Sequence, residues 1–106
     1  MDRYQEIKQQ RSDLVAGICA TIRARGRHIN QPRKAVIYAL VSQQQAMTAE
    51  ALWLGIRATH KISISAVYSN LNLLVEEGVV EKMQDDDAKS TYQVKTSFKV
   101  HGQQSN

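Results

Sequence analysis

The stretch from Ile62 to Gly78, ISISAVYSNLNLLVEEG, constrains the fold most, because a helix start, a helix stop and a two-sided surface coincide there. The hydroxyl group of Ser63 can cap the first turn, and Gly78 can close the last turn in the left-handed conformation. Apolar residues recur at steps of three and four, which predicts one buried stripe. The stripe consists of Ile64, Val67, Leu71, Leu74 and Val75.

The opposite face of this predicted helix carries polar side chains, which are short and uncharged near its N-terminal end. They are Ser65, Ser69, Asn72 and Glu76. Such a face suits a helix that enters a groove of DNA and reads base edges. An ordinary solvated face is the alternative, and it is the commoner property of amphipathic helices.

Length and composition indicate one globular domain. The chain has 106 residues, of which 42% are hydrophobic. No apolar run approaches the roughly 20 residues that a membrane span needs, and Met1 does not open a secretory signal. We therefore expect a cytoplasmic protein that does not associate with membranes.

Catalytic and metal-binding patterns are weak. Cys19 is the only cysteine, and it lies in an apolar helical stretch where a core position is expected. The histidines, His28, His60 and His101, are scattered and show neither metal-ligand spacing nor a neighbouring nucleophile. We predict that the protein is not an enzyme and uses no cofactor and no metal.

The net charge of +4 is distributed unevenly. Residues 23–34 contain five basic residues and no acidic one, whereas residues 76–87 contain six acidic residues and only Lys82 as a base. A compact basic patch attracts a phosphate backbone through Coulomb forces and counterion release. Such patches also occur on proteins that never bind nucleic acid, so this one supports DNA binding only modestly.

Three more helices are predicted before the central one. Gly26 ends the first, Asn30 caps the second with Pro32 in its first turn, and Thr48 caps the third. Their predicted ranges are Arg3–Arg25, Asn30–Val41 and Thr48–Thr59. Residues 2–13 are polar on nearly all sides, so we expect a frayed end or an arm. The short connector 60–62 makes the last two helices a helix-turn-helix pair.

Two strand-like runs, 79–84 and 90–95, follow Gly78 and are joined by Asp85 to Lys89, which predicts a hairpin. This order is typical of a winged helix-turn-helix domain, mainly α with a small β hairpin: three to four helices plus a two-stranded wing. We assign residues 1–95 to this domain and residues 96–106 to a polar C-terminal extension, disordered or short, in which Phe98 and Val100 are the apolar anchors.

Three ordered segments resemble the ferric uptake regulator family. ISISAVYSNLNLLVEEGVV is similar to its recognition-helix segment, INQPRKAVIYAL to an earlier helix start, and MTAEALW to its Ser-Ala-Glu-x-Leu-Tyr pattern. The resemblance covers roughly residues 14–94 and implies a transcription regulator whose central helix enters the major groove of double-stranded DNA. It implies that Tyr68 reaches bases or thymine methyl groups. It also places Arg27 and His28 where the family has a minor-groove basic residue, and Arg33 at its helix-start arginine.

The departures from the family pattern change what is expected. Ser69 stands where the family usually has arginine, so we expect weaker affinity or a different sequence preference. Three aspartates, Asp85 to Asp87, occupy the wing tip, which phosphate repels unless Lys89 reaches across. The metal-sensing positions of the family correspond to Gln45 or Ala46, to Gln93 and to His101, a poor ligand set. The resemblance does not extend to the family's C-terminal dimerisation domain. We therefore expect either a natural short form or an excised domain.

We therefore predict a metal-independent, DNA-binding transcription regulator. Electrostatic docking on the phosphate backbone of DNA is assigned to Arg25, Arg27, His28, Arg33 and Lys34. Base readout is assigned to Ser65, Ala66, Tyr68, Ser69 and Asn72. A lone module of this size covers little DNA, so we expect a homodimer or a second regulator as partner. The alternative is a protein-binding winged helix, an antagonist or adaptor of a regulator that uses its acidic wing.

Overall fold

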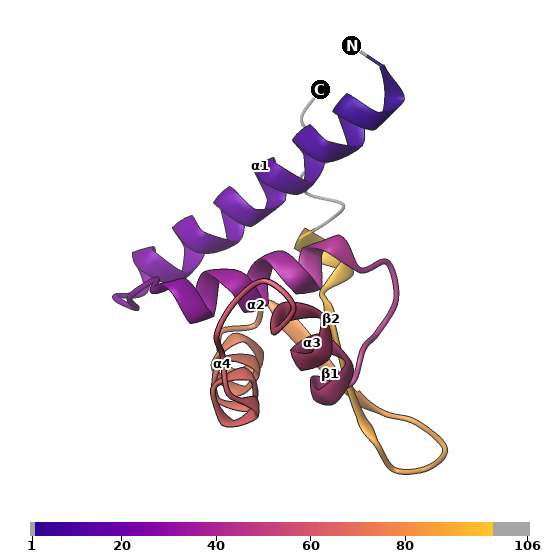
Figure 1. Cartoon of the computed structure of the whole chain (residues 1–106). Coiled ribbons are helices and arrows are strands. Elements are labelled where there is room, and N and C mark those ends of the chain that lie inside the picture. The colour runs from indigo at the N-terminus through magenta and orange to yellow at the C-terminus, as the bar shows by residue number, and fades with distance from the viewer. Residues whose placement is uncertain (1, 99–106) are drawn as a thin grey trace.

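Four helices and a β-hairpin account for most of residues 2–98, the part of the chain that this computed structural model describes (Figure 1). Their bounds are α1 Arg3–Ala24, α2 Gln31–Ser42, α3 Ala49–Ile56, α4 Ile64–Glu76, β1 Val80–Gln84 and β2 Ser90–Val94. Residues 96–98 are also helical. This order confirms the predicted winged helix-turn-helix fold.

Local capping chemistry sets the helix ends. The side chains of Asp2, Asn30, Thr48 and Ser63 each accept a hydrogen bond from the backbone N–H three residues later. Gly26 and Gly78 take positive φ angles of 81° and 78°, each directly after the C-cap residue of α1 or α4. The helix α3 ends at Ile56 and not near Thr59, because the N–H groups of Thr59 and His60 both bond the Ile56 carbonyl and turn the chain.

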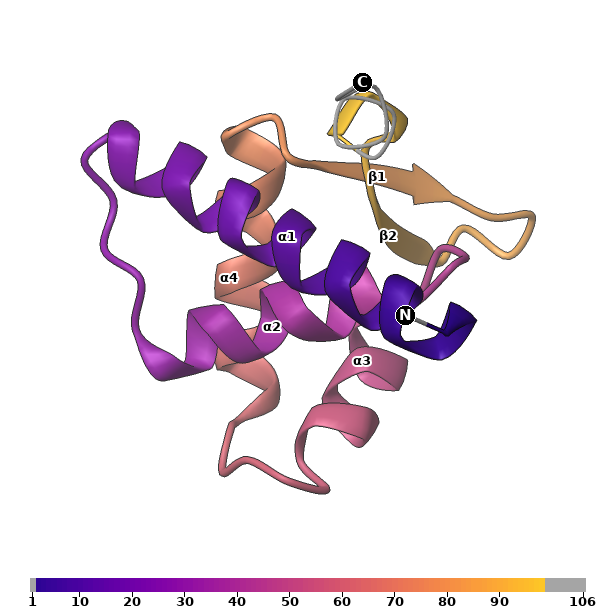
Figure 2. The ribbon, with the colours of Figure 1, turned by 90° about the horizontal axis from the view of Figure 1, so that it is seen from above.

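The core lies where α2 packs against α1, α3 and α4 (Figure 2). In α4 the side chains of Val67, Leu71 and Leu74 are completely buried, as the stripe predicts, whereas Ile64 and Val75 lie at its partly buried margins. Burial of one such side chain stabilises the fold by about 1.5–3 kcal/mol. This packing holds one side of α4 and leaves the other side free.

The N-terminal half of α1 is a helical arm that extends away from the other helices (Figure 1). The frayed alternative is wrong, because local contacts support the helix: Asp2 caps it and Gln9 bonds Asp13. The side chain of Ile7 is 38% exposed, because no other element of residues 2–98 covers the arm at that point.

The wing pairs β1 with β2 in antiparallel register, from Val80 opposite Val94 to Gln84 opposite Ser90. Tyr92, only 2% exposed, ties the wing to the loop between α2 and α3, because Met47 of that loop exchanges two backbone hydrogen bonds with it. Phe98 packs against the core, so the disordered alternative is wrong for residues 96–98. Val100 and His101 lie outside the described residues, and the boundary at residue 95 stays a prediction.

Candidate nucleic-acid interface

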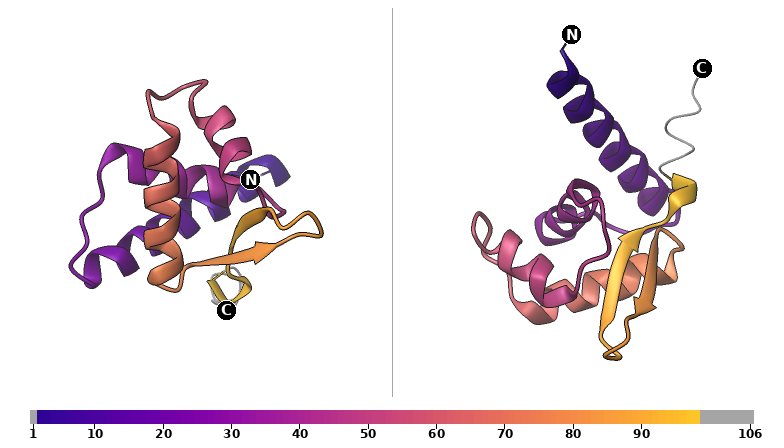
Figure 3. Two further views of the ribbon diagram at one scale, coloured as in Figure 1. Left: turned by 90° about the horizontal axis from the view of Figure 1, so that it is seen from below. Right: turned by 90° about the vertical axis from the view of Figure 1, so that its right-hand side faces the viewer.

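The polar face of α4 is open to solvent. Ser65, Ser69, Asn72 and Glu76 are all exposed, and Tyr68 on the same side is 37% exposed. Ala66 is half-buried, beside the cap that Ser63 forms with its N–H. Seen from below, α4 lies at the front of the molecule with no other element drawn over it, and the wing lies beside it (Figure 3). The five residues assigned to base readout therefore lie on one uncovered helix, while their contact with DNA stays a prediction.

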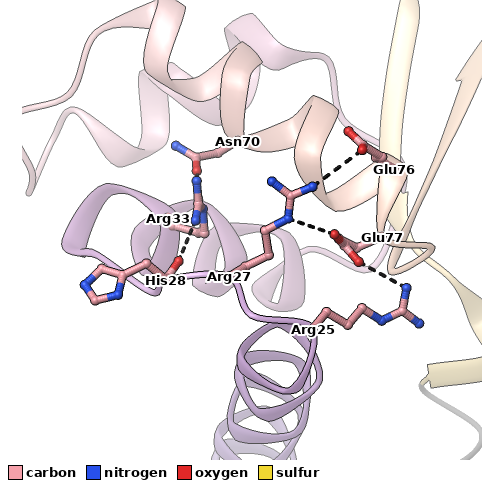
Figure 4. A network of polar contacts seen from close by, with 7 residues as sticks. All are labelled: Arg25, Arg27, His28, Arg33, Asn70, Glu76 and Glu77. Atoms are coloured by element: carbon pink, nitrogen blue, oxygen red, sulfur yellow. Dashed lines mark hydrogen bonds and ion pairs between the residues drawn. The ribbon is translucent and has the colours of Figure 1, made fainter.

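Arg33 is held between α2 and α4 by neutral acceptors. Its Nε donates to Asn70 Oδ1 at 2.8 Å, and its Nη1 donates to the His28 carbonyl (Figure 4). Asn70 is 7% exposed, and its amide nitrogen donates to the Ala66 carbonyl at 2.8 Å. Neither partner carries a negative charge, so neither offsets the positive charge of Arg33 beside the middle of α4.

Asn70 was not among the residues predicted to belong to the site. Its spacing was the available signal, because it comes three residues after Val67 and four before Leu74, on the buried side of the helix. A buried amide requires hydrogen-bond partners. The arginine at the start of α2 supplies one of them.

Arg25 and Arg27 are ion-paired, which the absence of acidic residues in 23–34 did not anticipate. Arg25 Nη1 lies 3.0 Å from Glu77 Oε1, and Arg27 Nε lies 2.9 Å from Glu77 Oε2 (Figure 4). Arg27 also lies 3.5 Å from Glu76. The hydrogen bond from Arg27 lowers the pKa of Glu77, and that from Arg25 lowers it further. Glu77, with its side chain 10% exposed, therefore places one negative charge between two of the five basic residues in 23–34.

Further exposed basic residues lie at the start of α2, in the loop before it and in the connector before α4. Lys34 and His28 are exposed, as are Arg57 and Lys61 in the connector before Ser63. The guanidinium of Arg57 lies 4.7 Å from the centre of the Trp53 ring, whose Nε1 donates to the Ile62 carbonyl at 3.0 Å. Arg57 and Lys61 were not among the residues predicted to contact DNA, although their place in the six residues before Ser63 was a usable signal.

The acidic wing tip is partly structural. Asp85 Oδ1 accepts hydrogen bonds of 2.9 Å from the N–H groups of both Asp87 and Lys89, and Ala88 takes a φ of 62°. Asp86 and Asp87 remain exposed. Asp85 is exposed as well, so all three carboxylates can meet a partner, although one oxygen of Asp85 is already bonded to the backbone of the wing tip.

The donor set does not fit the metal site that the family resemblance implies. The Gln93 amide nitrogen donates to the Gln44 carbonyl at 3.4 Å, so this neutral side chain ties β2 to the loop after α2. Within residues 2–98, no group of three or more His, Cys, Asp or Glu side chains is placed to hold a metal ion. His101 lies outside this range.

A hollow of about 480 Å³ lies between α2 and α3, away from the polar face of α4. Its lining includes Tyr38, Met47, Leu52 and Ile56.

Within the described range, no helix combines the length and the apolar character required to cross a bilayer.

Comparisons with known proteins agree with this geometry. The model of the ferric uptake regulator family matches residues 24–103. No curated protein sequence matches the chain. Similar solved structures include PerR from Streptococcus pyogenes, studied for peroxide sensing and gene regulation, with 23% identity and a TM-score of 0.71 over 76% of this chain and 56% of that one.

Two further solved structures are ferric uptake regulators. The Helicobacter pylori protein is 21% identical, with a TM-score of 0.68 over 79% of this chain and 57% of that one, and is described with three functional metal-binding sites. The Vibrio cholerae protein is 25% identical, with a TM-score of 0.63 over 70% of this chain and 58% of that one. The chain thus spans between 56% and 58% of the length of these three proteins.

Proposed function

Because the chain belongs to the ferric uptake regulator family, we propose that it regulates transcription by binding double-stranded DNA, with α4 in the major groove. The observation that carries this proposal is the uncovered polar face of α4, opposite a stripe whose central residues, Val67, Leu71 and Leu74, are completely buried. A recognition helix needs both properties, because the scaffold must hold it while its outer side chains reach base edges.

Contacts to phosphate and contacts to bases fall to different residues. Arg33, whose acceptors are neutral, and the exposed Lys34 and His28 are assigned to the backbone. Arg25 and Arg27 contribute to the extent that phosphate displaces Glu77. Base readout is assigned to Ser65, Ala66, Tyr68, Ser69 and Asn72.

The proposal requires neither a metal ion nor a cofactor. Gln93 replaces a charged ligand with an amide that already donates to the Gln44 carbonyl. A single domain covers about 600–1,000 Å² on DNA, which favours action as a homodimer or beside a second regulator.

The salt dependence of binding tests this function. Oligonucleotides selected from a random duplex pool are titrated with protein between about 50 and 200 mM salt, where each phosphate contact adds about 0.9 to the slope of log affinity against log salt. We expect Lys34→Ala and Lys61→Ala each to reduce the slope by about that amount. Lys8→Ala, on the exposed arm of α1, is the matched control and leaves the slope unchanged. Failure to bind any duplex at low salt would refute the proposal.

A protein-binding role for the wing predicts that different substitutions weaken binding. Binding to a basic partner would depend on the exposed Asp86 and Asp87 and would be insensitive to Lys34→Ala. Replacing both aspartates with asparagine separates the two functions. We expect this change to leave DNA binding intact or to strengthen it, because it removes negative charge from the wing.

A further inference from the structure

Tyr68 and Glu50 form a hydrogen bond between α4 and α3. The phenolic O–H of Tyr68 donates to Glu50 Oε2 at 2.6 Å, a length typical of a bond to a charged carboxylate. This bond is the main reason why the pKa of Glu50 is lowered and that of Tyr68 is raised. At neutral pH the pair therefore consists of an ionised Glu50 and a protonated Tyr68.

The pair lies beside the face of α4 that is assigned to DNA. Tyr68 comes three residues after Ser65 and four before Asn72, so the three side chains share one side of the helix. Glu50 lies in the first turn of α3. In a helix-turn-helix pair the first helix crosses the DNA backbone, so Glu50 reaches Tyr68 from the edge of the groove.

This bond changes what Tyr68 can read. A phenol has one hydrogen-bond donor, and here Glu50 already accepts it. The bond also restrains the ring, so less side-chain freedom is lost when DNA binds. The ring can then discriminate bases chiefly by apolar contact, and the apolar group that the major groove offers is the thymine methyl.

The carboxylate of Glu50 also lowers the affinity for DNA. A negative charge beside phosphate lowers affinity for every sequence, even though the nearby charge of Lys89 favours the ionised form. A residue that lowers general affinity while ordering a base contact increases the difference between right and wrong sites.

We propose that Glu50 is a positioning residue for base readout: it holds the hydroxyl group of Tyr68 so that the ring meets a thymine methyl in one orientation. This inference rests on the proposed DNA-binding function. It concerns a residue outside α4 that touches no base.

Replacing thymine with deoxyuridine tests the inference, because deoxyuridine differs only in lacking the methyl group. Each thymine of the selected duplex is replaced in turn. The quantity measured is the ratio of the affinity for the thymine duplex to the affinity for the deoxyuridine duplex. With the native protein we expect one position at which loss of the methyl weakens binding about fourfold. With Glu50→Ala we expect this ratio to fall to about one, while affinity for the deoxyuridine duplex is unchanged or higher. Tyr68→Phe, which removes the same bond from the other side, should lower the ratio in the same way.

Three variants serve as controls. Glu50→Gln retains an oxygen that accepts the Tyr68 hydrogen bond and should keep most of the ratio. The double variant Glu50→Ala with Tyr68→Phe should lower the ratio no further than either single change. Glu81→Ala removes an exposed carboxylate from β1 and should leave the ratio unchanged.

The possible failures are distinguishable. An unchanged ratio in Glu50→Ala and Tyr68→Phe overturns the role of Glu50, as does a native protein that binds duplex without sensing any methyl, and both leave the proposed function standing. A native protein that binds no duplex overturns both. If Glu50→Ala loses affinity for both duplexes through a folding defect, Tyr68→Phe decides.

Discussion

At the residue scale, Glu77 limits how the basic loop after α1 can act. Its two carboxylate oxygens accept hydrogen bonds from Arg25 and Arg27, which lie 52 and 50 residues away along the chain. These bonds hold the loop after α1 against the C-terminal end of α4. Phosphate must compete with Glu77 for both arginines, whereas Arg33 has only neutral acceptors.

The pH dependence of folding should reflect Glu77. Its pKa is lower than the ordinary value of 4.5, so its ionised form stabilises the fold above about pH 4.5, and this stabilisation is lost as the pH falls through the lowered value. We expect Glu77→Gln to be less stable at pH 7 and to lose less stability than the native protein below pH 4.5. Urea unfolding monitored by circular dichroism between pH 3 and 7 measures the difference. Glu81→Gln is the control, and a native-like pH profile for Glu77→Gln would contradict the assignment.

At the element scale, α4 combines two independent roles. Ser63 caps it through a 3.1 Å hydrogen bond from the Ala66 N–H, and Leu71 and Leu74 bury one side. The exposed hydroxyl groups on the other side contribute little to folding. Substitutions on the two sides of one helix should therefore separate stability from recognition.

Two serines two residues apart test this separation. We expect Ser63→Ala to lower the free energy of unfolding by about 1 kcal/mol, because it removes the cap. Ser65→Ala should change it by less than about 0.5 kcal/mol but weaken binding to the selected duplex. Thermal unfolding and anisotropy titration give both quantities for each variant. If the two substitutions had equal effects on stability, the assignment of Ser63 as the cap would fail.

At the scale of the whole molecule, α4 and the wing lie on one side, and the N-terminal arm of α1 extends from the opposite side (Figures 1 and 3). A duplex seated on α4 therefore leaves the arm free. Such a duplex also lies near the wing tip, where the exposed Asp86 and Asp87 disfavour close contact with phosphate. The footprint of one copy is correspondingly small.

Two copies on two half-sites would enlarge that footprint. We expect a duplex with two half-sites one helical turn apart, about 34–36 Å, to bind more tightly than a single half-site, on the order of 100-fold. Titration with each duplex, combined with sedimentation analysis of the complex, measures affinity and stoichiometry. Equal affinities with one copy per duplex would instead point to a second regulator as partner.

Much of the fold was predictable because its determinants are local. Ser63, Gly78 and the apolar stripe between them specify α4 through contacts within a few residues, as do Asn30 and Thr48 for α2 and α3. The composition of the polar face was predictable for the same reason. Its solvent exposure followed once the buried stripe was correctly placed.

Only the tertiary structure decided how the charged and hydrogen-bonding side chains are paired. Glu77 meets Arg25 across 52 residues, Asn70 meets Arg33 across 37, and Tyr68 meets Glu50 across 18. Helical periodicity describes which side of an element a residue occupies, but not which other element packs there. The sequence alone therefore determined the helices and their two-sided surfaces, while the packing of those helices determined which arginines keep their charge free and which tyrosine is restrained.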